Sequence, residues 1–132
     1  MRFIYTLSIS FILSMFILSF AWAADVNCLQ QSADSIRSVR LVHKGADHYA
    51  MTVEKKTGSN YSRETSQAMP CHQMKIEGTS FLGARCNFME YIEIHFERNS
   101  DTGLFSVYQT ININGRPELV QSYGSQMACV VK

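Results

Sequence analysis

Residues 89–98 read MEYIEIHFER, and this stretch decides the fold class. Ile92, Ile94 and Phe96 alternate with polar side chains, so an extended chain would place the apolar residues on one face and the polar residues on the other. Such alternation is typical of an antiparallel strand with one buried face and one wet face. The wet face is expected to carry Tyr91, Glu93, His95 and Glu97.

The segments on both sides of this strand also carry strand and turn signals. Asn114-Gly115 is a strong signal for a two-residue hairpin turn, because both residues tolerate positive φ. Pro117 lies in the returning segment and favours an edge position there, since proline cannot donate a ladder hydrogen bond. Further short strands are expected over residues 38–44, 47–56, 60–67, 80–87, 104–112, 118–123 and 127–131.

About seven to nine short strands joined by turns predict a mostly-β fold, a small antiparallel β-sandwich or β-barrel. Residues 28–36 carry Leu29, Ala33 and Ile36 at helical spacing, which allows one short N-terminal helix. A two-layer sheet with that helix is the alternative architecture. Residues 24–132 are expected to form one domain, since 109 residues suit a single core.

Residues 1–23 have the pattern of a secretory signal peptide. One basic residue, Arg2, precedes a long apolar run, and Ala21-Trp22-Ala23 matches the small-x-small site of a signal peptidase. We therefore expect cleavage after Ala23 and export to the periplasm or the extracellular space. No later apolar stretch is long enough to span a bilayer, so no membrane association is expected after cleavage.

The four cysteines all follow this leader, and an even number in a small exported chain predicts two disulfides. A hairpin turn at Gly78-Thr79 would place Cys71 directly opposite Cys86, close enough to bridge. Cys28 and Cys129 would then join the two ends of the domain. We favour this pairing among the three that four cysteines allow.

The charge of the exported part is balanced, with eleven basic and eleven acidic side chains once Arg2 is removed. Nucleic-acid binding depends on clustered lysine and arginine, and the densest basic site is the pair Lys55-Lys56. We therefore expect no nucleic-acid partner, and no residue pattern calls for a cofactor.

A metal site is one chemical alternative. A hairpin turn at Gly45-Ala46 would pair Lys44 with Asp47 and would place His43 opposite His48. Two imidazoles on a hairpin are half of a zinc or copper site, which needs a third or fourth ligand. The same register would pair Arg37 with Glu54.

An enzyme is the other chemical alternative, with a site near Glu93 and His95. No G-x-S-x-G motif occurs, and cysteines held in disulfides are not nucleophiles, so no catalytic residues are predicted. A concave pocket in which Glu93 and His95 converge would favour an enzyme.

The leading hypothesis is a non-enzymatic exported binding domain. Its expected partner is a protein, ahead of a glycan or a small ligand, and one concrete form is an inhibitor of an envelope or secreted hydrolase. Tyrosine and arginine are enriched at protein interfaces, and several of both occur after the leader. The candidate binding residues are Tyr91, Glu93, His95 and Arg63.

Overall fold

The computed structural model describes residues 24–132, and the expected signal peptide over residues 1–23 lies outside the described residues. Residues 24–132 form ten β-strands and no helix. Within this range no helix is long and apolar enough to cross a membrane. The strands are β1 (Val26–Gln31), β2 (Ser35–Gly45), β3 (His48–Thr57), β4 (Asn60–Thr65), β5 (Met69–Pro70), β6 (Lys75–Glu77), β7 (Ser80–Met89), β8 (Ile92–Arg98), β9 (Phe105–Ile113) and β10 (Arg116–Val131).

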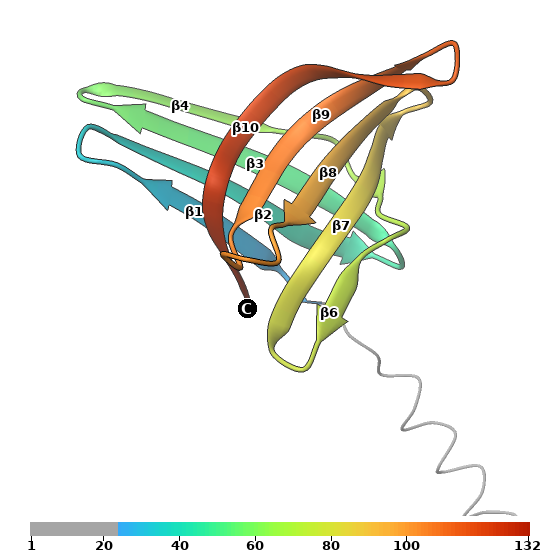
Figure 1. The fold of residues 1–132 in the computed structure, drawn as a ribbon, viewed down its shortest axis with the longest axis horizontal. Helices are drawn as coiled ribbons and strands as arrows, with labels where there is room; N and C mark the ends of the chain where they lie inside the picture. The colour runs from blue at the N-terminus through green and yellow to red at the C-terminus, as the bar shows by residue number, and fades with distance from the viewer. Residues whose placement is uncertain (1–23) are drawn as a thin grey trace, which may run out of the picture.

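All ten strands belong to one antiparallel sheet that bends over on itself without closing. The strand order is β4-β3-β2-β1-β10-β9-β8-β7-β6, with β5 paired to β3 outside this path. The mostly-β antiparallel fold predicted from the alternation is therefore confirmed. Strands β1 to β4 form one half of the sheet and β7 to β9 the other, and the strands of the two halves cross one another (Figure 1).

The hydrophobic core lies between the two facing halves. Val39 and Leu41 come from β2, and Ile94 and Phe96 come from β8, so the apolar face of the 89–98 stretch is the buried one. Other buried members of the core include Val26, Met51, Phe81, Phe105, Val107 and Met127. Both halves contribute side chains because neither face could be covered by a helix in this all-strand fold.

Strand β10 joins the two halves and is the site of the bend. It pairs with β9 as far as Met127 and with β1 from Ala128 onward. Its register against β9 shifts three times, and Gln126 adopts a φ of 58°. Such bulges add unpaired residues on one strand, which bends the strand and increases its twist. The two strands expected over 118–123 and 127–131 are thus one bent strand.

Both predicted disulfides are present, Cys28–Cys129 and Cys71–Cys86. Cys28 lies opposite Cys129 in the β1–β10 ladder, and Asp25 and Lys132 beyond it exchange two backbone hydrogen bonds of 3.2 and 2.8 Å. The other bridge depends on the Gly78-Thr79 turn, as expected. Two intramolecular disulfides are consistent with an oxidising compartment.

The short helix allowed at residues 28–36 is absent from the structure. This segment contains β1, a bend and the start of β2, and Cys28 and Val39 face one another across the ladder. Leu29 and Ile36 stay substantially exposed. The three apolar residues at helical spacing supply fewer than three turns, too few to outweigh pairing of β1 with both of its neighbours.

The register predicted for the hairpin at Gly45-Ala46 is wrong by one residue. Gly45 pairs with His48, Lys44 becomes an extra residue in a bulge, and His43 pairs with Tyr49 instead of His48. Farther along the same ladder, Arg37 lies opposite Lys55 and not Glu54.

This shift follows from core packing. The observed register places Val39 opposite Val53 and Leu41 opposite Met51, all pointing into the space between the two halves. A slip of one residue would turn one strand's apolar set toward water. The two charge pairs of the predicted register, worth roughly 0.2–1 kcal/mol each, cannot offset that loss.

Candidate functional site

The candidate site lies on the outer face of β8, opposite the core. Glu93, His95 and Glu97 alternate with the buried Ile94 and Phe96, as the sequence predicts. Tyr91 belongs to the turn that precedes β8 rather than to the strand itself. Its side chain is 60% exposed.

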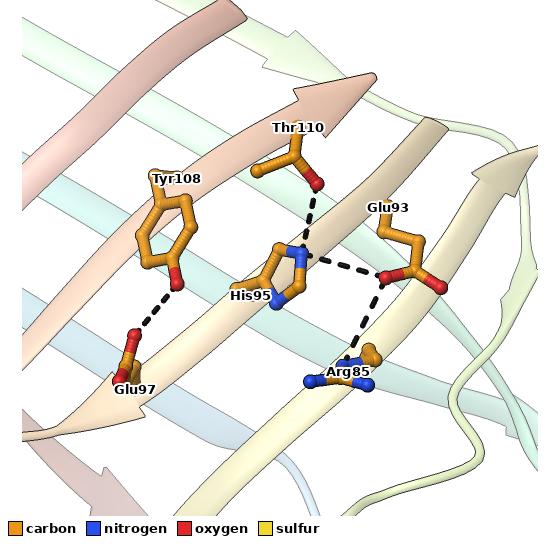
Figure 2. Close-up of polar contacts among 6 residues, drawn as sticks. All are labelled: Arg85, Glu93, His95, Glu97, Tyr108 and Thr110. Atoms are coloured by element: carbon orange, nitrogen blue, oxygen red, sulfur yellow. Dashed lines mark hydrogen bonds and ion pairs between the residues drawn. The ribbon is translucent and has the colours of Figure 1, made fainter. Parts of the chain in front are cut away.

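Strands β7 and β9 bring further polar residues beside this face. Arg85 on β7 and Tyr108 on β9 flank His95 in one cross-strand row, and Thr110 lies opposite Glu93 in the next row. Figure 2 shows these side chains standing together above three neighbouring strands. We call the six residues the outer polar cluster: Arg85, Glu93, His95, Glu97, Tyr108 and Thr110.

His95 is at the centre of the outer polar cluster. Its Nε2 atom lies 2.9 Å from Thr110 Oγ1 and 3.5 Å from Glu93 Oε2, and its ring stacks on Tyr108 with centroids 4.9 Å apart (Figure 2). The side chain is only 14% exposed. Burial, reinforced by the cation of Arg85, lowers the pKa of His95 below its ordinary value of about 6.5, although Glu93 and Glu97 oppose that shift. These surroundings therefore favour the neutral form of the imidazole.

Tyr108 and Glu97 form a second fixed pair. The Tyr108 hydroxyl donates to Glu97 Oε2 over 2.6 Å, the length expected of a hydrogen bond to a charged acceptor. Burial, this hydrogen bond and the negative charge of Glu97 raise the pKa of Tyr108 to about 12. The ring of Tyr108 is thus held at one end by Glu97 and stacked on His95 along its face.

An open hollow of about 650 Å³ lies over this part of the sheet. Its wall includes five of the six members of the outer polar cluster, and Glu93 is the member that does not line it. The pocket expected for an enzyme, with Glu93 and His95 converging in it, is therefore only half formed. Side chains of β6 and of β10 complete the wall through Lys75, Pro117 and Leu119.

The hydrogen bonds of His95 bear on nucleophilic catalysis. In a hydroxyl–histidine–carboxylate relay, one ring nitrogen contacts the hydroxyl and the other contacts the carboxylate. Here Thr110 and Glu93 both approach the same nitrogen, Nε2. The three residues thus do not form such a relay, and Thr110 acts as a partner that orients the ring.

The structure does not bring Arg63 to this site. Arg63 lies on the edge strand β4, where its Nε atom is 3.6 Å from Glu54 Oε1. Strand β4 and strand β8 are separated by five strands in the sheet order. Tyr91, Glu93 and His95 share one region, and Arg63 is a separate surface residue.

The two histidines considered as metal ligands have other contacts. His43 Nε2 lies 2.7 Å from the carbonyl oxygen of Ala46, and its ring meets that of Tyr49 edge to face. His48 Nδ1 lies 2.9 Å from Asp47 Oδ1. Within residues 24–132 no group of three or more His, Cys, Asp or Glu side chains is placed to hold a metal ion.

The binding residues predicted from the sequence, Tyr91, Glu93, His95 and Arg63, leave out the other four members of the outer polar cluster, which are Arg85, Glu97, Tyr108 and Thr110. These four residues could have been found by pairing residues 89–98 with the flanking strands. Residues two apart along a strand share a face, and so do residues directly opposite one another on paired strands. Comparison of the chain with protein-family models, with curated proteins and with solved structures found no match.

Proposed function

We propose that this protein is a non-enzymatic exported binding domain whose partner is another protein. The binding surface would be the outer face of β7 to β10, with the outer polar cluster at its centre. One observation carries the proposal: large apolar side chains stay exposed beside the polar hollow. Leu119, which lines the hollow, is 67% exposed, and Tyr91 is 60% exposed.

This combination matches the composition of protein interfaces. Tyrosine and arginine anchor such interfaces, and an exposed apolar group beside well-ordered polar groups is what a partner can desolvate. The Tyr91 carbonyl accepts a hydrogen bond from the Asn112 N–H over 2.8 Å, which ties the β7–β8 turn to the end of β9. The β7–β8 turn, which contains Tyr91, is thereby held next to the tip of the β9–β10 hairpin, as Figure 1 shows.

The shape of the hollow supports a protein partner over a small ligand. Sites for small molecules enclose most of the ligand surface. This hollow lies on an outer sheet face and is open to solvent rather than enclosed. A protruding loop or strand of a partner fits such a surface, and inhibition of an envelope or secreted hydrolase is one form that the interaction would take.

The experiment is capture of partners by the oxidised exported chain from the periplasm and culture medium of the producing cell. A protein captured specifically should be recovered about tenfold less well by a Tyr91→Ala, Leu119→Ser double variant, as expected when anchor residues are lost. Tyr61→Ala is the matched control, because Tyr61 is 61% exposed but lies on β4. Equal losses in the two variants, or no specific capture with both disulfides intact, would contradict the proposal.

An enzyme is the second candidate, and the position of His95 in the wall of the hollow favours it. A neutral imidazole that lines a hollow can act as a general base toward water or a substrate hydroxyl. Such an activity should increase as the pH rises through the lowered pKa of His95 and should disappear in His95→Gln. A panel of ester, glycoside, peptide and phosphate substrates assayed from pH 5 to pH 8 tests it.

A further inference from the structure

The hollow has a charge of its own, although the exported domain as a whole is balanced. The charged residues in its wall are Lys75, Arg85, Arg98 and Glu97, three basic and one acidic. The single carboxylate, that of Glu97, already accepts the hydrogen bond from Tyr108. The hollow therefore attracts an anionic group.

Arg85 is the residue best placed to bind that group. Its Nε atom is 3.8 Å from Glu93 Oε2, which is too long for a hydrogen bond, and its side chain is 43% exposed. In the described part of the chain, the guanidinium has this ion pair and no hydrogen bond. A forked guanidinium with unused donors is suited to a carboxylate, which it can bind through two parallel hydrogen bonds.

The opposite end of the same hollow is apolar. Pro117 and Leu119 of β10 line it there, and Leu119 pairs with Thr110 of β9. From β7 to β10 the sheet order crosses three strand spacings, which is about 14 Å. An extended chain advances about 3.4 Å per residue, so two side chains four residues apart span this distance.

We infer that the hollow binds an extended segment of a partner protein that carries an acidic side chain and an apolar side chain four residues apart. The acidic side chain pairs with Arg85, and the apolar side chain packs on Pro117 and Leu119. The inference rests on the proposed function, because it specifies the partner chemistry of the same surface. It goes further by specifying the charge of the partner segment, the spacing of its two side chains and the residues of the hollow that each one contacts.

The experiment is an NMR titration of the oxidised exported chain, labelled with ¹⁵N, with capped pentapeptides. The probe has glutamate at one end, leucine at the other and threonine and serine between them, and it is made in both chain directions. We expect saturable shifts for Arg85, His95, Thr110 and Leu119 below about 10 mM peptide. The same peptide with glutamine in place of glutamate should bind about tenfold more weakly, the effect of losing one charged hydrogen-bonded pair.

Three variants test the assignment of Arg85. Arg85→Gln should weaken binding about tenfold, and Glu93→Gln should strengthen it two- to fivefold, roughly the gain from removing a competing exposed carboxylate. Arg63→Gln is the matched control, because Arg63 also has one glutamate near its Nε atom but lies on β4. It should leave the affinity unchanged.

Several outcomes would overturn the inference. These are equal binding of the glutamate and glutamine peptides, no saturable shift of the outer-face residues, or an Arg85→Gln variant with unchanged affinity. Inorganic phosphate that competes as well as the peptide would replace the inference with a general anion site. A partner captured equally by the parent chain and by Arg85→Gln, yet lost with Tyr91→Ala and Leu119→Ser, would keep the proposed function and reject only the acidic segment.

Discussion

The rings of His95 and Tyr108 stack across neighbouring strands with an angle of 8° between their planes. Each ring is also held by a polar contact, His95 by Thr110 and Tyr108 by Glu97. A pair of flat side chains fixed in this way loses little conformational freedom when a partner binds. The pair gives the outer face of β8 and β9 an ordered surface, and its ionisation can be measured directly.

Tyr108 should ionise only at strongly alkaline pH. Its pKa of about 12 lies above the ordinary tyrosine value of about 10, because burial and Glu97 both disfavour the phenolate. The folded state thus holds the proton more tightly than the unfolded state. The contribution of the Tyr108–Glu97 pair to the free energy of unfolding should be fully present below about pH 10 and should be lost as the pH rises toward 12.

Two variants separate the causes of this shift. The urea midpoint of Tyr108→Phe should differ from that of the parent chain, and this difference should shrink between about pH 10 and pH 12. In a pH titration followed by absorbance at 295 nm, the variant should lack the tyrosine ionisation that occurs at the highest pH. Glu97→Gln should lower the pKa of Tyr108 without restoring the ordinary value, since burial remains. A Tyr108 transition unchanged in Glu97→Gln would show that Glu97 has no part in it.

The imidazole of His95 should respond in opposite directions to its two charged neighbours. Arg85→Gln should raise the pKa of His95, because a nearby cation is removed, and Glu93→Gln should lower it further. The ring signals in ¹H–¹³C NMR spectra recorded from pH 4 to pH 8 report both shifts. Shifts of the same sign in the two variants would contradict this electrostatic account.

Stability should also depend on His95. Since its folded pKa is lowered, the unfolded state binds the proton more readily, and stability is complete only above about pH 6.5. The parent chain should lose stability as the pH falls through the folded pKa of His95. His95→Gln should lack this contribution, so the urea midpoints of the two chains should converge in acid.

Removing the disulfide that closes the longer loop should cost more stability, although the cost grows only with the logarithm of loop length. Cys71 and Cys86 are 15 residues apart, and Cys28 and Cys129 are 101 apart. Chain entropy predicts losses of about 3 and about 4.7 kcal/mol for the paired alanine variants. Denaturant unfolding of both variants measures these losses. A larger loss for the Cys71–Cys86 pair would show that native contacts and not loop entropy dominate.

Gly83 should not tolerate a side chain. Its φ is +149°, and a Cβ atom there would lie 2.9 Å from the backbone oxygen of Phe96. Gly83→Ala should destabilise the fold by about 1–3 kcal/mol because the clash is with a backbone atom. Gly78→Ala is the control, since Gly78 has a φ of +57° but open space around it. Thermal unfolding of the pair should place Gly83→Ala clearly below Gly78→Ala.

The parts of the fold that the sequence predicts well are those governed by local period and turn chemistry. The 89–98 alternation led to a correct buried face, and Asn114-Gly115 forms its turn with φ of 51° and 78°. The Cys71–Cys86 disulfide follows from the turn at Gly78-Thr79, and Cys28–Cys129 is the pair that then remains. The parts predicted poorly depend on distant contacts: the Lys44 bulge is decided by core residues on two strands, and the bend of β10 by irregularities with no simple sequence pattern.

In the candidate site, too, the residues on one strand were predictable from the sequence, and their neighbours on other strands were not. Glu93 and His95 share a face because of the strand period, and that requires nothing beyond their own strand. The neighbours that fix them, Arg85 and Thr110, depend on which strands pair and in which register. Arg63 was grouped with them on residue type alone, and type carries no information on position in space.

The paired backbone hydrogen bonds between Asp25 and Lys132 place the two ends of the described chain beside one another. Joining them through a short linker should leave the sheet intact, which makes the domain a candidate for circular permutation, with new ends opened at an exposed turn such as Gly58. The ends also lie at the far end of β10 from the β7–β8 turn and from the tip of the β9–β10 hairpin (Figure 1). A carrier or solid support attached after Lys132 would therefore present the proposed binding surface outward.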